Sequence, residues 1–207
     1  MHPVFHGIMS IFFDMSTYGV VQKNILDPKD LTQHYKEEIV DISLDGIYVT
    51  THYADISNTI ESYKYRSDRQ HVWEYVDILA KTGDIYWVFS STSDICIVGV
   101  PMHWSRYMIR GFNHIDLIVS RLSRKLWIEQ RKPLRAFFTR RQSKLSKSMR
   151  IKNREYAFGI LTKIKLPKTV ILIDDILSTG STANACAKIL KSRWVEKVYG
   201  LFIASNQ

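Results

Sequence analysis

Residues 170–182 read VILIDDILSTGST, and the interpretation of the whole chain starts from this stretch. Four consecutive apolar residues predict a buried strand over 170–173, of the kind found in parallel sheets. The strand is expected to end at Asp174 and Asp175, after which a turn leads into a helix. Two acids beside a core are costly unless their charge is compensated. The stretch therefore predicts a ligand site at the carboxyl edge of a sheet.

The turn after the two acids has the composition of a phosphate site. Its candidate residues are Ser178, Thr179, Gly180, Ser181 and Thr182. Free N–H groups at a helix start bind phosphate, and glycine allows close approach of the backbone. Carboxylates accept hydrogen bonds from hydroxyl groups and hold Mg²⁺ directly or through water. The two halves together fit a ribose 5-phosphate, whereas an ordinary helix N-cap explains the hydroxyl groups but not the acids.

The rest of the chain alternates predicted strands with predicted helices. Strands are expected within residues 45–53, 85–91, 94–101, 169–174 and 195–205. Helices are expected within residues 56–65, 71–83, 112–129 and 181–193. This alternation indicates an α/β fold with a mostly parallel, twisted sheet flanked by helices.

Length and charge divide the chain into a main domain and an appendage. The chain has 207 residues, of which 45% are hydrophobic, and no apolar run is long enough to span a bilayer. Residues 1–45 are acidic and are expected to be an appendage of unknown role, followed by a main domain over residues 46–207. Residues 106–154 hold fifteen basic and two acidic residues, which favours anionic partners or is simply a solvated surface. The N-terminus lacks the basic segment of a signal peptide, so a cytoplasmic location is expected.

The cysteine and histidine patterns argue against a zinc site and a disulfide framework. Cys96 and Cys186 are far apart and are the only cysteines, so each is expected to be a buried apolar residue. The seven histidines form no HxH or HExxH pattern. His103 and His114 are therefore not expected to be metal ligands.

Residues 170–182 resemble the motif with which type I phosphoribosyltransferases bind phosphoribosyl diphosphate (PRPP). That motif has four apolar residues, two acids, two or three variable residues, Thr-Gly, one residue, and then Ser or Thr. The resemblance implies that Asp174 and Asp175 hold the ribose 2- and 3-hydroxyl groups together with Mg²⁺. It also implies that residues 178–182 hold the 5-phosphate.

Further motifs resemble those of ComF-like (GntX-like) proteins, which have the phosphoribosyltransferase fold and are named for bacterial competence. The motifs are KYRSD at 64–68, VPMH at 100–103, RGFN at 110–113 and QSKL at 142–145, with Arg150 and Asn153. The resemblance covers residues of about 45–207. Ser67 replaces the usual glycine, and no cysteine precedes Cys96. The four-cysteine zinc knuckle with which such proteins often begin is therefore not expected.

The resemblance implies an enzyme that displaces pyrophosphate from C1 of PRPP. The pyrophosphate-binding candidates are Pro101, Arg106, Arg110, Lys64 and Arg66, although both helix arginines also fit a solvated surface. Residues 139–155 are expected to form a flexible loop with the candidates Arg141, Lys144 and Arg150. Purine-salvage enzymes place an Asp where this chain has Ser178, so the acceptor is not identified. Binding of PRPP with little turnover is left open.

Two functions of different classes follow. The first is phosphoribosyl transfer to or from a nitrogenous acceptor with pyrophosphate exchange, in DNA uptake or nucleotide salvage. The second is a non-catalytic competence factor that binds single-stranded DNA, because basic residues alternate with aromatic ones, as in single-strand binders. We nevertheless expect these aromatic side chains to lie in the core; they are Trp104, Tyr107, Phe112, Trp127, Phe137 and Phe138. A homodimer is left open.

Overall fold

The computed structural model describes residues 42–65, 72–85, 88–89, 92–102, 104–137 and 158–206. The predicted loop at 139–155 and residues 1–41 of the predicted appendage lie outside these ranges. Both assignments therefore stay predictions. Leu44 and Asp45, at the end of the predicted appendage, pack on the main domain, where Leu44 is 3% exposed and belongs to the core.

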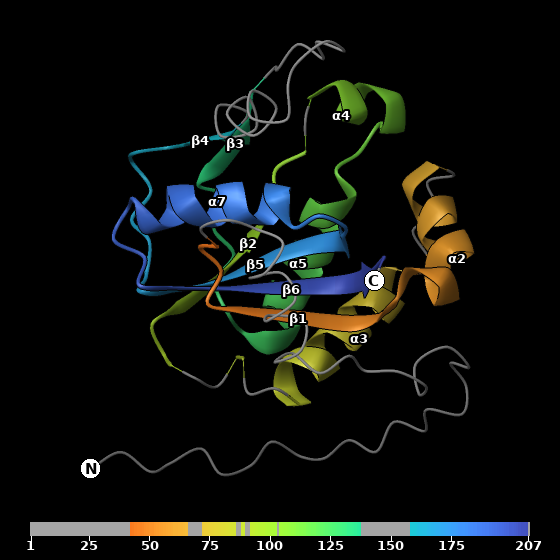
Figure 1. Ribbon diagram of the computed structural model, residues 1–207, viewed down its shortest axis with the longest axis horizontal. Helices are drawn as coiled ribbons and strands as arrows, with labels where there is room; N and C mark the ends of the chain where they lie inside the picture. The colour runs from red at the N-terminus through yellow and green to blue at the C-terminus, as the bar shows by residue number, and fades with distance from the viewer. Residues whose placement is uncertain are drawn as a thin grey trace.

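The described strands form a parallel sheet and a small antiparallel one (Figure 1). The parallel sheet has the order β1-β6-β5-β2, and the antiparallel sheet pairs β3 with β4. The strands are β1 (Gly46–His52), β2 (Ile95–Gly99), β3 (Leu134–Ala136), β4 (Phe158–Ile160), β5 (Thr169–Leu177) and β6 (Lys197–Ser205). The predicted α/β fold with a mostly parallel sheet is confirmed.

Helices cover both faces of the parallel sheet. The helices are α2 (Tyr53–Tyr65), α3 (Val72–Ile85), α4 (Trp104–Arg110), α5 (His114–Leu126) and α7 (Ser181–Lys191). Helix α7 packs on one face, whereas α3 and α5 pack on the other (Figure 1). The sheet therefore separates two hydrophobic clusters, one on each side.

The alternation of side chains along β5 explains why its sequence is a continuous apolar run. Val170 and Leu172 belong to the cluster under α7, whereas Ile171 and Ile173 belong to the cluster under α5. All four side chains are 0% exposed. Because successive residues of a strand point to opposite faces, the part of β5 that is covered on both sides, residues 170–173, is apolar at every position.

Two sequence-based boundaries around residue 83 are wrong. Helix α3 continues through Gly83 to Ile85, and Val88 and Phe89 lie in a turn instead of the predicted strand at 85–91. A Cβ atom at Gly83 would collide with the ring of Phe89. This glycine is therefore a packing position inside the helix, where the missing side chain makes room for an aromatic ring, and not a helix terminator.

Candidate functional site

A pocket of about 900 Å³ lies at the carboxyl ends of β2 and β5. The helices that follow these two strands pack on opposite faces of the sheet, which opens a crevice between them. Ala136, Phe137 and Phe158 of the small β3–β4 sheet form another part of the wall. The pocket brings together residues that the sequence predicted separately, namely residues 100–102, Arg110, residues 174–175 and residues 178–182.

Asp174 and Asp175 line this pocket from within β5. The prediction that the strand ends at the two acids is wrong, because β5 stays paired with β6 as far as Leu177. Asp175 contacts α5, whereas Asp174 lies close enough to Cys186 of α7 to raise the pKa of that thiol, which burial has already raised. Asp174 Oδ1 accepts the Asp175 N–H at 2.9 Å, and Asp175 Oδ1 accepts the Ile176 N–H at 2.7 Å. The backbone of β5 therefore orients both carboxylates.

The predicted phosphate segment forms the start of α7. Gly180 is the N-cap residue with φ 65° and ψ −7°, a left-handed conformation that favours glycine. The cap has no side-chain hydrogen bond, and Thr179 Oγ1 instead lies 2.9 Å from Ser181 Oγ. The hydroxyl groups are therefore not explained as an ordinary N-cap. The first N–H groups of a helix lack partners within the helix, so this wall of the pocket is suited to an anion.

His114 forms a polar cluster with Asp175 and Arg110 in the pocket wall. The sequence analysis did not include His114 among the candidate site residues. His114 Nε2 lies 2.8 Å from Asp175 Oδ2, and their side chains are 6% and 14% exposed. His114 Nδ1 lies 3.2 Å from Arg110 Nη1. Because 61 residues separate the imidazole from its carboxylate partner, the sequence shows only that Arg110 lies four residues before His114.

The other predicted anion contacts divide into two groups. Pro101 and Arg110 line the pocket. Arg110 is half-buried and bonded to His114, so its alternative interpretation as part of a solvated helix surface does not hold. The remaining candidates lie outside the described side chains; they are Lys64, Arg66, Arg106, Arg141, Lys144 and Arg150.

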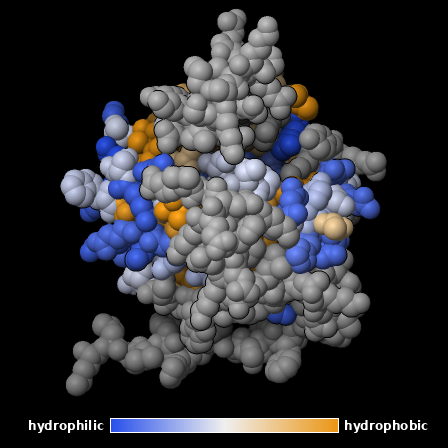
Figure 2. Space-filling view, viewed as in Figure 1, coloured by the Kyte–Doolittle hydropathy of each residue, from blue (hydrophilic) through white to orange (hydrophobic). Residues whose placement is uncertain are grey.

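The expectation that the aromatic residues lie in the core is wrong for most of them. Trp104, Tyr107, Trp127 and Phe137 are 57%, 50%, 94% and 54% exposed, and only Phe112 packs against the core. Trp127 follows α5 at φ 56°, and this left-handed turn takes the indole away from the sheet. Trp104 and Tyr107 belong to α4, a helix that the sequence did not predict. Residues coloured as hydrophobic show at the position of this helix in Figure 2. Phe138 lies outside the described residues.

Both cysteines are buried, as predicted. Burial raises the pKa of Cys96 to about 12, and it also raises that of Cys186. Within the described ranges, no group of three or more His, Cys, Asp or Glu side chains is arranged to hold a metal ion. In the same part of the chain, no helix has the length and apolar character needed to cross a membrane.

Curated relatives share sequence with about half of this chain. Competence protein F of Haemophilus influenzae is 36% identical over 106 residues, which are 49% of this chain and 46% of that protein. The predicted resemblance to ComF-like proteins is confirmed. Competence protein ComFC of Streptococcus pneumoniae is 32% identical over 101 residues, which are 49% of this chain and 44% of that protein. DNA utilization protein YhgH of Escherichia coli is 35% identical over 100 residues, which are 45% of this chain and 42% of that protein.

The matches to these ComF-like relatives span less than half of their length. No family model matches the chain. Among solved structures, an adenine phosphoribosyltransferase aligns with a TM-score of 0.43 at 17% identity, covering 68% of this chain and 73% of that one. An orotate phosphoribosyltransferase from Aeropyrum pernix aligns with a TM-score of 0.41 at 13% identity, covering 68% of this chain and 75% of that one.

Proposed function

We propose that the pocket binds PRPP with Mg²⁺ and transfers the phosphoribosyl group to or from a nitrogenous acceptor with pyrophosphate exchange. The observation that carries this proposal is the placement of two carboxylates and a phosphate-type helix start in one pocket. Asp174 and Asp175 are hydrogen-bond acceptors for a ribose diol, and residues 178–182 offer N–H and hydroxyl groups to a 5-phosphate. The competence and DNA utilization names of the relatives favour a role in handling incoming DNA.

The donor set at this edge fits Mg²⁺ only in part. Two carboxylates could supply hard oxygen ligands, but the described residues offer no third acidic, histidine or cysteine side chain arranged to hold the ion with them. Mg²⁺ requires six oxygen ligands, so ligand oxygens and water have to complete its coordination. Bound with PRPP, the ion would offset negative charge on the pyrophosphate. Asp174 and Asp175 would hold the ribose face from the strand.

The rest of the pocket suits the chemistry of the displacement. When the bond from C1 to the pyrophosphate oxygen breaks, its electron pair leaves with pyrophosphate and positive charge develops on the ribose ring. Pro101, Met102 and Arg110 line the same pocket, and the Arg110 guanidinium would receive the leaving anion. A bond from C1 to the acceptor nitrogen then forms, and the proton of that nitrogen passes to the released pyrophosphate or to water. Phe137 and Phe158 add an apolar wall that an aromatic acceptor can stack against and that limits access of water.

Calorimetric titration with PRPP tests this proposal. The wild type is titrated with and without Mg²⁺, beside the Asp174→Asn/Asp175→Asn double variant. Asp116→Asn is a matched control, because Asp116 pairs with Lys132 outside the pocket. We expect binding that needs Mg²⁺, that the double variant loses and that the control keeps. A screen of nitrogenous bases for pyrophosphate release then tests transfer. Absence of PRPP binding by the wild type would contradict the proposal.

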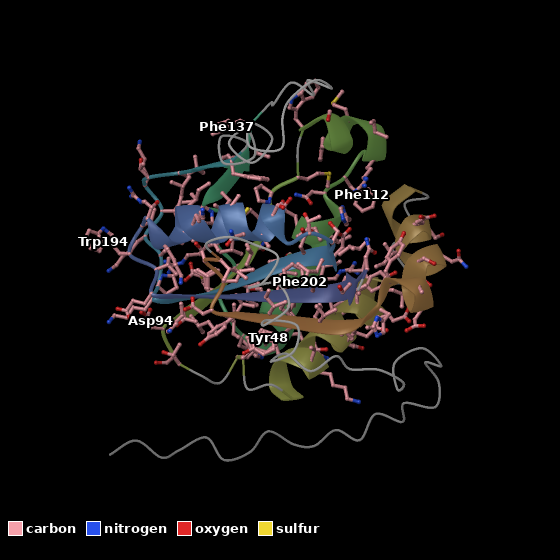
Figure 3. The ribbon with its side chains drawn as sticks, viewed as in Figure 1. Tyr48, Asp94, Phe112, Phe137, Trp194 and Phe202 are labelled. Atoms are coloured by element: carbon pink, nitrogen blue, oxygen red, sulfur yellow. The ribbon has the colours of Figure 1, made fainter. Side chains whose placement is uncertain are left out.

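A second candidate function, binding of single-stranded DNA, is favoured by the exposed aromatic side chains near the pocket. Trp104, Tyr107 and Phe137 are each at least half exposed, and Phe137 lines the pocket itself. Stacking of a base on an aromatic side chain contributes about 1–3 kcal/mol. Trp194 is a suitable control, because it is 93% exposed and lies at the opposite end of the sheet from Phe112 (Figure 3).

Fluorescence anisotropy with a labelled oligothymidine tests this second function. We expect Trp104→Ala/Tyr107→Ala to weaken binding about tenfold or more, and Trp194→Ala to leave it unchanged. Affinity should also fall steeply with added salt, as it does when phosphates are neutralised. Equal effects of the two substitutions would rule out the α4 surface as the binding site.

A further inference from the structure

Three polar side chains from three different elements form a continuous hydrogen-bonded chain in the wall of the pocket. Arg110 is the last residue of α4, His114 is the first residue of α5, and Asp175 lies on β5. Arg110 Nη1 is 3.2 Å from His114 Nδ1, and His114 Nε2 is 2.8 Å from Asp175 Oδ2. All three side chains line the pocket. The imidazole therefore connects the anion-binding side of the pocket with its carboxylate side.

Local structure explains why Arg110 and His114 face each other across the corner between the helices. Gly111 has φ +73° and its N–H donates to the Tyr107 carbonyl at 2.7 Å, which ends α4. Asn113 caps α5, accepting the Asp116 N–H at 3.3 Å. The chain thus turns within three residues, and the guanidinium reaches back to the imidazole that opens the next helix.

The hydrogen-bond chemistry of the three groups assigns the tautomer of His114. A guanidinium group has five N–H donors and no acceptor, so the His114 Nδ1 that meets Arg110 must carry the lone pair. The ring proton is therefore on Nε2, and it donates to Asp175 Oδ2.

The two donors on Asp175 come from different parts of the molecule. Its Oδ1 accepts the Ile176 N–H at 2.7 Å, and its Oδ2 meets the His114 ring at 2.8 Å. The His114 side chain is only 6% exposed, and a buried polar group that loses its partner is costly. The plane of the carboxylate is therefore set by its own strand and by α5 together.

We propose that His114 is a positioning residue of the PRPP site, acting through its Nε2–H group. It holds the Asp175 carboxylate in the orientation that receives the ribose diol and keeps Arg110 at the pyrophosphate side. This inference rests on the proposed function, because PRPP is the ligand that it names. The hydrogen-bonded geometry of the three side chains does not depend on the ligand. The ring exchanges no proton with the substrate.

A pair of substitutions separates this role from simple packing. In His114→Gln, the amide N–H₂ can donate to Asp175 while the amide oxygen accepts from the flexible Arg110 side chain. His114→Leu fills a similar volume but offers neither group. We expect the glutamine variant to bind PRPP with Mg²⁺ within about threefold of the wild type, and the leucine variant about tenfold or more weakly, as for lost hydrogen bonds to charged groups. Equal affinities of the two variants would overturn the proposal.

Nitrogen-15 NMR of the imidazole in the protein without ligand provides a second, independent readout. We expect the ring proton of His114 on Nε2 and an unprotonated Nδ1 at neutral pH. A proton on Nδ1, or on both nitrogens, would overturn the proposal whether or not PRPP binds. If the wild type fails to bind PRPP, the proposed function fails. The NMR result then tests the hydrogen-bonded chain without PRPP. So does thermal unfolding, in which we expect a lower midpoint for the leucine variant than for the glutamine variant.

Discussion

Replacing Gly99 by alanine tests how closely α5 must approach the sheet to reach Asp175. Gly99 ends β2, and a Cβ atom there would lie 2.9 Å from Ile115 Cγ2 and 3.4 Å from Val119 Cγ2. Ile115 and Val119 are 2% and 0% exposed, and the χ1 angle of β-branched residues in a helix is restricted. The methyl groups cannot move aside, so α5 itself must shift, and Ile115 directly follows His114.

The expected cost follows from two opposing terms. Overpacking of a core costs about 1–3 kcal/mol. Alanine in place of a strand glycine recovers about 0.5–1 kcal/mol. We therefore expect Gly99→Ala to lower the free energy of unfolding, measured by urea titration, by about 1 kcal/mol and by at most about 2.5 kcal/mol.

A double-mutant cycle with Ile115→Ala identifies the contact responsible. This substitution removes Cγ2, so the two effects should be less than additive by about 1 kcal/mol. Gly111→Ala is the matched control, because φ is +73° there and a Cβ atom would meet nothing within 4 Å. Its cost is in the backbone alone and should add to that of Ile115→Ala. Additive effects of Gly99→Ala and Ile115→Ala would refute the reasoning.

Three further predictions concern residues outside the pocket or beneath it. Burial raises the pKa of Asp45, but Val198 N–H and Lys191 outweigh burial and hold it below its usual value. Asp45→Asn should therefore lower the free energy of unfolding by about 1 kcal/mol at pH 7 and by progressively less below about pH 4. A loss of stability that stays the same in acid would contradict this prediction. Cys96 and Cys186 should resist alkylation until the protein unfolds, because burial keeps them protonated, and rapid labelling of the native protein would contradict this. Trp194→Asn should be neutral or stabilise by up to about 1 kcal/mol, since Trp194 is 93% exposed at φ 67°; a clear loss of thermal stability would show a packing role.

Much of the sheet was predictable because burial leaves a local pattern. The strands β2, β5 and β6 each contain a buried, largely apolar run, which is typical of strands covered on both faces. The amphipathic spacing within 112–129 likewise predicted α5, with Ile118 and Leu122 buried. These patterns arise within single segments, so they can be recognised without knowledge of the partners.

Features that depend on distant segments were missed or misjudged. The end of β5 was placed too early because Asp174 and Asp175 interrupt its apolar run, although pairing with β6 continues as far as Leu177. Helix α4 was missed because four of its seven residues are exposed and apolar, so it has no amphipathic pattern. Trp127 was expected in the core because its neighbours are apolar, but one left-handed residue turns it into solvent.

The sequence by itself determined that two carboxylates and a hydroxyl-rich helix start lie at one edge of a parallel sheet. Nine residues hold all of these groups, so their proximity follows from strand and helix geometry alone. Only the tertiary structure decided that Asp174 and Asp175 face different helices and that His114 and Arg110 complete the wall. The physical reason is that α5 is positioned by packing against β2 and β5, which depends on chain segments far apart in sequence.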